Sequence, residues 1–248
     1  MLLLSNDDGV LAEGLAALAT ALAPIDTLLV VAPAIEQSAK SHSLSLFTPL
    51  RARLHRPGWY GVTGTPADSV YFALNHLCKT PPRAVISGIN RGSNIGSDVH
   101  YSGTVAAARE AAFSGVPALA VSLYTEEGGD RKHWESAGSL AATVLQKMLA
   151  APLPAGVLLN LNVPNRPLSE IVGLVAAPMG DRAYEALVRE DRDPRGKPYY
   201  WIGGPAILSE EELHTDCSLL TRGYATLTPL LTDVTAHRLL DRVGTLLD

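Results

Sequence analysis

The first 32 residues narrow the possible folds of this chain more than any other stretch. Residues 2–4 are three leucines that predict a short buried strand, and residues 27–32 (TLLVVA) predict a second one from their continuous apolar, β-branched character. Between them, residues 11–22 place leucines at three- and four-residue spacing on one helix face, at Leu11, Leu15, Leu18 and Leu22. Strand, helix and strand in this order open a doubly wound α/β fold.

The same alternation continues to about residue 165. We expect a Rossmann-like core over residues 1–165, with a mostly parallel sheet. A loosely alternating segment over residues 44–62 predicts an extended arm or hairpin within it. The other expected elements are helices over residues 66–77, 105–113 and 134–149, and strands over residues 83–87, 118–122 and 157–162.

Residues 166–248 differ from this core. Residues 166–204 carry many prolines and glycines and a charged run over residues 189–197. This composition predicts a projecting C-terminal β-hairpin, with residues 174–177 paired with residues 199–202, and such arms often make oligomer contacts or swap between subunits. The remaining expected elements are a strand over residues 223–227, a terminal helix over residues 235–243 and a solvated helix start at Glu210, Glu211 and Glu212.

Composition and charge exclude several classes of protein. The 248 residues carry a net charge of −5 and no Lys/Arg block, so duplex nucleic acid is not expected as the main partner. No apolar run approaches the roughly 18 residues of a membrane helix. The two cysteines, Cys78 and Cys217, are far apart and form no CxxC motif, so a disulfide framework and a thiolate zinc site are unsupported. The N-terminal leucines are too few for a secretion signal, so we expect a cytoplasmic protein without membrane contact.

Two adjacent carboxylates, Asp7 and Asp8, follow the first predicted strand. Ligands of open α/β sheets bind at the carboxyl ends of the strands, and adjacent ionised carboxylates usually have a cation or strong donors nearby. Asn, Asp and Gly are also ordinary turn residues, so this stretch alone fits a metal or catalytic centre and a solvated turn equally well. Ser38 and Asn90 follow neighbouring predicted strands. Together these four side chains offer only oxygen, which suits Mg²⁺ or Mn²⁺ rather than Zn²⁺.

A glycine-rich loop follows the predicted strand over residues 83–87. It matches neither GxGxxG nor the P-loop, but backbone amides in such a loop can approach a phosphate. We expect the phosphate oxygens to be held by Asn94, Ser102, Gly103 and Thr104. Ser102 and Thr104 also fit a plain helix cap, which is the commoner role for such residues at a helix start.

This set of residues indicates phosphoester hydrolysis. A phosphatase with an aspartate nucleophile in a DxD arrangement would place its carboxylates two residues apart, whereas Asp7 and Asp8 are adjacent. We therefore favour metal-activated water, with one carboxylate of this catalytic pair as the base. His42 is a candidate substrate contact near the same edge, although packing or surface exposure is the commoner role of a histidine.

Six segments, in their order and spacing, resemble the SurE family of survival proteins, which are metal-dependent nucleotidases. Four of them are residues 5–9 (SNDDG), 64–68 (GTPAD), 102–105 (SGTV) and 160–164 (NLNVP). The other two are discontinuous: residues 32–33 (AP) with 36–38 (EQS) and 42–43 (HS), and residues 87–90 (SGIN) with Gly92 and Asn94. The resemblance implies one SurE-like domain over residues 1–248, with a swapped C-terminal arm and homodimers or homotetramers. It implies hydrolysis of nucleoside 5′- and 3′-monophosphates, with short polyphosphate as a further candidate substrate. It places one divalent cation on Asp7, Asp8, Ser38 and Asn90, and the phosphate pocket around Asn94, Ser102, Gly103 and Thr104.

Three positions depart from the family pattern. Ala34 stands where an acid or amide is frequent, Ala39 where a glycine usually follows the ligand serine, and Tyr101 where a histidine often precedes Ser-Gly-Thr. If that histidine transfers protons, Tyr101 cannot replace it directly, although His100 is adjacent. None of the three departures removes a predicted metal ligand.

Two other functions are alternatives to the nucleotidase. A non-catalytic nucleotide- or phosphate-binding regulatory protein needs hydrogen-bond donors at this edge and not the carboxylate pair of Asp7 and Asp8. A dehydrogenase on the same core needs the GxGxxG fingerprint, which this sequence lacks.

Overall fold

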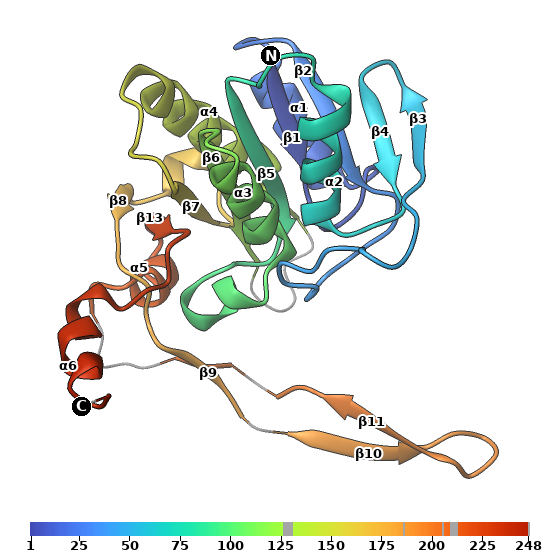
Figure 1. Ribbon diagram of the computed structural model, residues 1–248, viewed down its shortest axis with the longest axis vertical. Coiled ribbons are helices and arrows are strands. Elements are labelled where there is room, and N and C mark those ends of the chain that lie inside the picture. The colour runs from blue at the N-terminus through green and yellow to red at the C-terminus, as the bar shows by residue number, and fades with distance from the viewer. Residues whose placement is uncertain (126–130, 186, 205, 209–212, 248) are drawn as a thin grey trace.

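The chain folds around one large, mostly parallel sheet. The computed structural model describes residues 1–125, 131–185, 187–204, 206–208 and 213–247. Within them, nine strands form the sheet in the order β3-β4-β2-β1-β5-β6-β7-β13-β8 (Figure 1). These strands are β1 (Leu2–Ser5), β2 (Leu28–Pro33), β3 (Ala52–Arg56), β4 (Trp59–Val62), β5 (Ala84–Arg91), β6 (Ala118–Tyr124), β7 (Val157–Pro164), β8 (Leu174–Ala176) and β13 (Ala225–Leu231). Neighbouring strands are parallel except β3 with β4 and β13 with β7, which confirms the predicted fold class.

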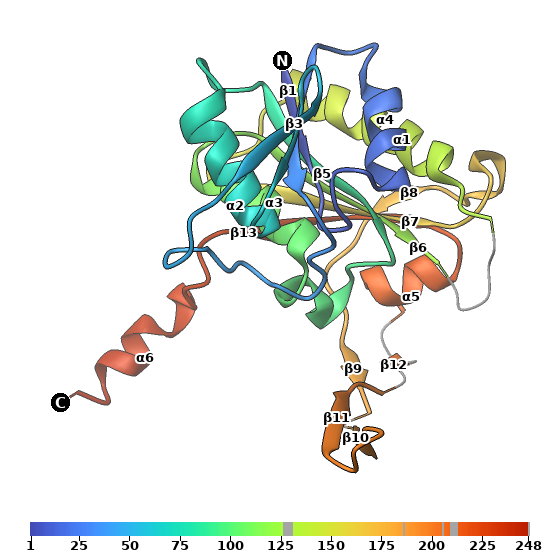
Figure 2. The ribbon, with the colours of Figure 1, turned by 90° about the vertical axis from the view of Figure 1, so that its right-hand side faces the viewer.

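Helices cover both faces of this sheet. Figure 2 shows α1 (Glu13–Leu22) and α4 (Trp134–Ala150) on one face and α2 (Pro66–Phe72) and α3 (Gly103–Phe113) on the other. Helix α1 packs against α4, and α2 packs against α3. The single-turn elements are η1 (Ala73–Leu77), η2 (Gly96–His100), η3 (Leu168–Glu170) and η4 (His237–Leu239).

The first helix is shorter than its leucine pattern predicts. Three leucines of the predicted face are fully buried, namely Leu15, Leu18 and Leu22. The prediction for Leu11 is wrong, because this side chain is 79% exposed. Leu11 lies in a turn closed by a hydrogen bond from the Ala12 N–H to the Gly9 carbonyl, and the helix begins only at Glu13.

The start of α2 confirms the capping chemistry of its sequence. The Thr65 hydroxyl accepts a hydrogen bond from the Asp68 N–H, and the Asp68 carboxylate accepts one from the Thr65 N–H. Pro66 occupies the first turn, where its missing N–H costs nothing. The predicted helix over residues 66–77 is therefore α2 followed by η1.

The predicted pairing of residues 174–177 with residues 199–202 is wrong. Strand β8 instead extends the main sheet beside β13, where its apolar residues are half-buried. The strand at residues 199–202 is part of β11 (Pro198–Ile202), which pairs with β10 (Val188–Arg192). A second antiparallel pair, β9 (Arg182–Tyr184) with β12 (Ala206–Leu208), joins this hairpin to the core. We call the described residues 182–185 and 187–204 the arm.

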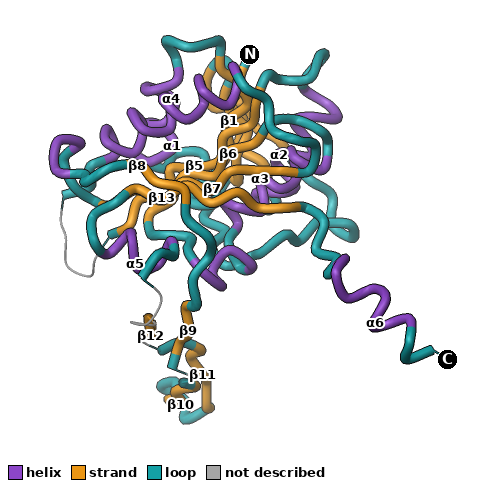
Figure 3. Tube along the Cα trace, turned by 90° about the vertical axis from the view of Figure 1, so that its left-hand side faces the viewer, coloured by secondary structure: helices purple, strands orange, loops and turns teal. Residues whose placement is uncertain are grey.

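The C-terminal part leaves the core at two places. Figure 3 shows the arm and the C-terminal segment projecting separately from the sheet. The predicted helix over residues 235–243 is the short turn η4 followed by α6 (Leu240–Gly244), while α5 (Asp216–Thr221) packs beside β13. Glu210, Glu211 and Glu212 lie outside the described residues. Among the helices described, none combines the length and apolar character that crossing a bilayer requires.

Candidate metal and phosphate site

The carboxylate pair lies on a turn directly after β1. The buried Asn6 closes this turn, because its side-chain amide donates to the Gly9 carbonyl at 3.0 Å and its side-chain oxygen accepts from the Gly9 N–H at 3.2 Å. Gly9 has φ +103°, a conformation that favours glycine. A turn and a candidate site therefore coincide here, since the turn presents Asp7 and Asp8 at the carboxyl end of β1.

Asp7 is the more buried carboxylate, with 4% of its surface exposed. Burial raises the pKa of Asp7 to about 6, the Thr104 hydroxyl opposes this rise by donating to its carboxylate, and the charge of Asp8 adds to it. Gly103 packs directly on the same side chain: a Cβ at this position would lie 2.9 Å from the Asp7 Cβ. The N-terminal turn of α3 is thus in contact with Asp7.

Asp8 is half-buried and interacts with the other side of the site. Its carboxylate accepts a hydrogen bond from the Arg91 N–H at 3.2 Å. Burial raises the pKa of Asp8, the bond from Arg91 opposes the rise, and the nearby charge of Glu36 adds to it. Two carboxylates whose burial disfavours their charged forms are a suitable environment for a cation.

The loop after β2 brings Ser38 to the same place. The Gln37 N–H donates to the Asp7 carbonyl at 2.8 Å, and the Ser38 hydroxyl donates to Glu36 at 2.9 Å. Ala39 follows with φ +56°, so the alanine adopts the left-handed conformation in which a glycine would be unstrained. The departure at this position therefore does not prevent the loop from turning.

His42 anchors the far end of this loop. Its Nε2 lies 2.7 Å from the Glu110 carboxylate on α3, and its ring stacks on Phe113 with centroids 5.5 Å apart. His42 is not among the residues that line the cavity described below, so the structure gives it a packing role.

Asn90, the fourth predicted ligand, lies near the end of β5. Its side-chain amide donates to the Gly92 carbonyl at 2.9 Å. Among the described residues, no hydrogen-bond donor reaches its side-chain oxygen, which leaves that oxygen available to a ligand. The described part of the chain gathers no three His, Cys, Asp or Glu side chains as a metal group, so a cation here depends on the mixed set. Two carboxylates, a hydroxyl and an amide oxygen fit a hard divalent cation.

Asn94 is held rigidly by polar side chains of neighbouring strands. Its N–H donates to Asn162, its carbonyl accepts from both Asn160 and Asn162, and its side-chain amide donates to Ser122 at 2.7 Å. In the sequence, only the Asn-Leu-Asn alternation in β7 indicated that Asn160 and Asn162 make such hydrogen bonds, because a buried apolar strand rarely carries two amides without a structural need.

Ser102 is the N-cap of α3, which confirms the capping role predicted from the sequence. Its hydroxyl accepts a hydrogen bond from the Val105 N–H at 3.1 Å. Ser102, Gly103 and Thr104 occupy the first turn of an eleven-residue helix, where unpaired N–H groups and the helix dipole favour an anion. The cap and the phosphate role are therefore compatible.

A cavity of about 660 Å³ opens in front of these side chains. Of the eight predicted site residues, five line it: Asp7, Ser38, Asn90, Asn94 and Ser102. The other three do not line it but contact residues that do, since Gly103 and Thr104 contact Asp7 and Asp8 contacts Arg91. The structure thus brings all eight residues into one region.

The arm forms the opposite wall of this cavity, which the sequence did not indicate. Arg182 and Tyr184 both bind Asp98, the arginine at 3.0 Å and the tyrosine hydroxyl at 2.8 Å. Burial raises the pKa of Tyr184 to about 12, and the bond to Asp98 adds to this rise, so the hydroxyl remains a donor at neutral pH.

Asp216 ties the glycine-rich loop to the C-terminal part of the chain. This fully buried carboxylate, at the start of α5, accepts from the Gly96 N–H at 3.1 Å and from the Gly180 N–H at 2.7 Å. No pattern in the sequence marks this contact, because Asp216 lies 120 residues from Gly96.

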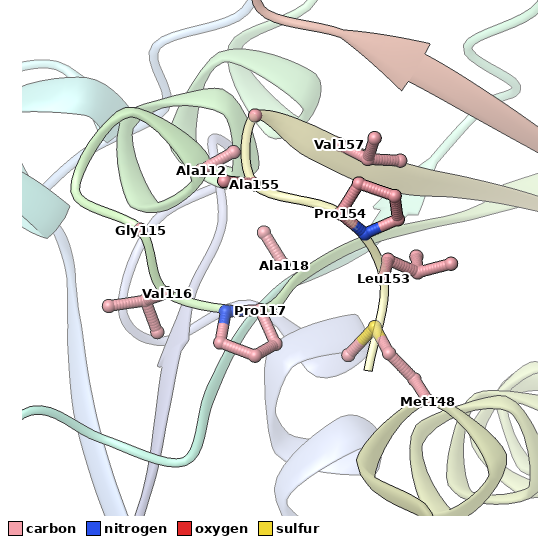
Figure 4. A pocket seen from close by; sticks show the side chains of 11 residues that line it. Ala112, Gly115, Val116, Pro117, Ala118, Met148, Leu153, Pro154, Ala155 and Val157 are labelled. Carbon is pink, nitrogen blue, oxygen red and sulfur yellow. The ribbon is translucent and has the colours of Figure 1, made fainter. Parts of the chain in front are cut away.

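A second pocket lies at the other edge of the sheet, at the amino ends of β6 and β7. Figure 4 shows that it is lined by small and apolar side chains, among them Val116, Pro117, Leu153 and Pro154. It contains no ionisable side chain, so it is not a candidate for phosphate chemistry.

Comparison with known proteins identifies relatives over the whole chain. A family model described as Survival protein SurE matches residues 2–186. The 5'-nucleotidase SurE of Nitrosococcus oceani is 44% identical over 243 residues, which cover 98% of this chain and 96% of the relative. The 5'-nucleotidase SurE of Aeromonas hydrophila is 44% identical over 253 residues, with 100% and 98% coverage. The crystal structure of the SurE protein from Aquifex aeolicus superposes with a TM-score of 0.87 at 36% identity, covering 100% of this chain and 99% of that one.

Proposed function

This chain belongs to the SurE family, and from this premise we propose that it is a divalent-metal-dependent phosphomonoesterase acting on nucleoside 5′- and 3′-monophosphates. Short polyphosphate is a further candidate substrate. One observation carries the proposal: the first turn of α3 contacts Asp7, through Thr104 and Gly103. A carboxylate suited to a cation thereby lies against a helix start suited to a phosphate.

We propose that Asp7, Asp8, Ser38 and Asn90 hold one divalent cation, with Mg²⁺ or Mn²⁺ as the candidates. When bound, such a cation polarises a phosphoryl oxygen and lowers the pKa of water. The first turn of α3, with Ser102, Gly103 and Thr104, binds the phosphate oxygens, and Asn94 borders the same space. One carboxylate of the Asp7–Asp8 pair takes the proton of the attacking water.

The alternative of a non-catalytic binding protein is not favoured. A site that only binds phosphate gains from donors, whereas the buried Asp7 and half-buried Asp8 carboxylates repel such a ligand unless a cation is present. The structure gives no support for proton transfer by Tyr101, because no hydrogen bond of its hydroxyl to an ionised group occurs among the described residues.

Metal removal tests this function directly. Phosphate release from a panel of nucleoside monophosphates should cease in EDTA and return when Mg²⁺ or Mn²⁺ is added in excess. Circular dichroism in EDTA should retain the α/β signal, which separates loss of the cation from unfolding. Turnover that persists in EDTA, or that no divalent cation restores, would contradict the proposal.

We further propose that the protein acts in the cytoplasm as a homodimer or homotetramer assembled through its C-terminal part. The support is the apolar surface of the arm, where Trp201 is 67% and Ile202 is 90% exposed. Surfaces of this kind are usually covered in an assembly. Light scattering on the full chain measures the number of subunits, and a monomer at micromolar concentration would contradict the assembly.

A further inference from the structure

Arg182, the first residue of the arm, packs its side chain against the glycine-rich loop that carries Asn94. The side chain is only 15% exposed. Its Nη1 donates to the Ser93 hydroxyl at 3.0 Å and lies 3.0 Å from the Asp98 carboxylate. Ser93 and Asp98 line the cavity, whereas Arg182 does not. Arg182 is therefore placed to act on the cavity through these two residues and not by direct contact with a ligand.

The backbone of Arg182 is joined to the same loop. The Ser97 hydroxyl donates to the Arg182 carbonyl. The loop also lies against the arm without space for a further side chain, because a Cβ added to Gly96 would lie 2.9 Å from the Arg182 Cβ and 2.8 Å from the Gly180 carbonyl oxygen. Residue 93 and residues 96–98 all contact this one arginine, so the loop is fixed to the arm on both sides of Asn94.

Asp98 connects this contact to the start of α3. Its carbonyl accepts hydrogen bonds from the Tyr101 N–H and from the Ser102 N–H, both at 3.0 Å. Ser102 is the N-cap of α3, and the first turn of that helix is the proposed phosphate site. One residue thus binds Arg182 with its side chain and the helix start with its backbone. Displacement of the Asp98 side chain would loosen the turn that holds the phosphate.

The charge of Arg182 acts together with its hydrogen bonds. Within the described residues, the cavity is lined by three acidic side chains, Asp98 among them, and by one basic side chain, Arg91. An unpaired carboxylate in such a cavity repels a phosphate group and lowers its affinity. Arg182 offsets the charge of Asp98, whereas the Tyr184 hydroxyl, which also binds this carboxylate, donates a hydrogen bond without a positive charge.

We propose that Arg182 is a positioning residue for phosphate binding: it fixes the loop around Asn94 and the start of α3, and it neutralises Asp98 beside them. This inference rests on the proposed phosphomonoesterase function and gives the arm a part in forming the phosphate site. In the described part of the chain, no hydrogen bond or ion pair joins Arg182 to the four proposed metal ligands. A change at position 182 should therefore weaken phosphate binding and leave the cation site intact.

The test measures phosphate binding and turnover of the full-length protein in excess Mg²⁺. In Arg182→Ala, the Kd of inorganic phosphate in calorimetric titration and the KM for adenosine 5′-monophosphate should each rise about 10-fold. The Mg²⁺ concentration needed for half-maximal activity should stay within about twofold of the parent. Arg182→Gln, which loses the charge but fills most of the same volume, should show the same rise, and Arg182→Lys should lose less because it keeps the charge. The matched control is Arg189→Ala, which removes an exposed arginine of the same arm and should behave as the parent.

A second substitution separates the charge of Arg182 from its structural contacts. Adding Asp98→Asn to Arg182→Ala removes the unpaired carboxylate charge, so the Kd of inorganic phosphate should fall about threefold from its value in Arg182→Ala. A purely structural role predicts a further loss of affinity instead, because Asp98→Asn weakens the same set of contacts.

Three results overturn the inference. They are a phosphate Kd within about twofold of the parent in both Arg182→Ala and Arg182→Gln, an equal rise in the phosphate Kd and in the Mg²⁺ requirement, and no recovery in the double variant. A parent protein that binds phosphate but hydrolyses no nucleotide refutes the phosphomonoesterase, while the calorimetric comparison still decides the role of Arg182.

Discussion

Replacing Asp7 by asparagine should stabilise the metal-free protein while abolishing its activity. Burial raises the pKa of Asp7 from the ordinary 3.8 to about 6. A raised carboxyl pKa means that the folded state prefers the protonated form, so this stabilising effect is present below about pH 4 and is lost as the pH rises through about 6. About two pKa units correspond to about 3 kcal/mol of unfolding free energy at neutral pH.

Asp7→Asn removes this charge and keeps an oxygen that can accept the Thr104 hydroxyl. In EDTA at pH 7.5, we expect the variant to be more stable than the parent by between about 1 and 3 kcal/mol, because the buried amide recovers only part of the penalty. At pH 4.5 the advantage should shrink by about 2 kcal/mol, since Asp7 is then protonated in the folded parent.

The assay is urea unfolding of both proteins in EDTA at the two pH values and at equal subunit concentration. Comparing the difference between the variants at each pH cancels the titration of all shared groups. Excess Mg²⁺ or Mn²⁺ should then stabilise the parent and leave Asp7→Asn unchanged, because only the parent retains the full ligand set. A variant that is less stable than the parent at pH 7.5, or a difference that does not depend on pH, would refute the reasoning.

Two further substitutions test how the site is held. Gly103→Ala should lower kcat/KM for nucleotides at least 10-fold, because the added Cβ would lie 2.9 Å from the Asp7 Cβ. The control is Gly244→Ala, because an added Cβ there would have no atom within 4 Å. Equal kinetics of the two variants would contradict the close contact between Gly103 and Asp7. His42→Ala should lower the unfolding free energy by about 1–3 kcal/mol in urea titrations, because it leaves the buried Glu110 carboxylate without its partner 2.7 Å away. It should also raise the metal concentration needed for half-maximal activity, and unchanged values of both would count against an anchoring role for this pair.

The sequence predicted the core of the fold because its signals are local. The apolar run before Asp7 and the cap at Thr65 depend on neighbouring residues alone, and the structure bears both out. Leu11 was placed wrongly because periodicity does not reveal that a turn precedes the helix. The predicted partner of β8 was also wrong, because β8 pairs with a strand about 50 residues away in the sequence.

In the candidate site, too, local sequence signals could be interpreted and contacts between distant residues could not. Asp7, Ser38 and Asn90 could be found because each lies at or just beyond the carboxyl end of a strand of a parallel sheet, and such strand ends meet at one edge. Asp98 and Tyr184 could not, because their contact joins residues 86 positions apart and one of them lies on an irregular arm. The wall that the arm adds to the cavity is thus information that only the three-dimensional structure contains.

The bond between Asp216 and Gly96 has a consequence for biosynthesis. The loop that carries Asn94 and leads to the first turn of α3 gains its last anchor from a residue made long after it. At translation rates of about 5–20 residues per second, the ribosome needs roughly 10 s to proceed from Gly103 to Asp216. A nascent chain therefore makes β1 and its carboxylate turn early but gains this anchor of the loop only after Asp216 has been synthesised. Ribosome-bound chains arrested before Asp216 should therefore be partly folded and inactive, since the loop lacks this anchor.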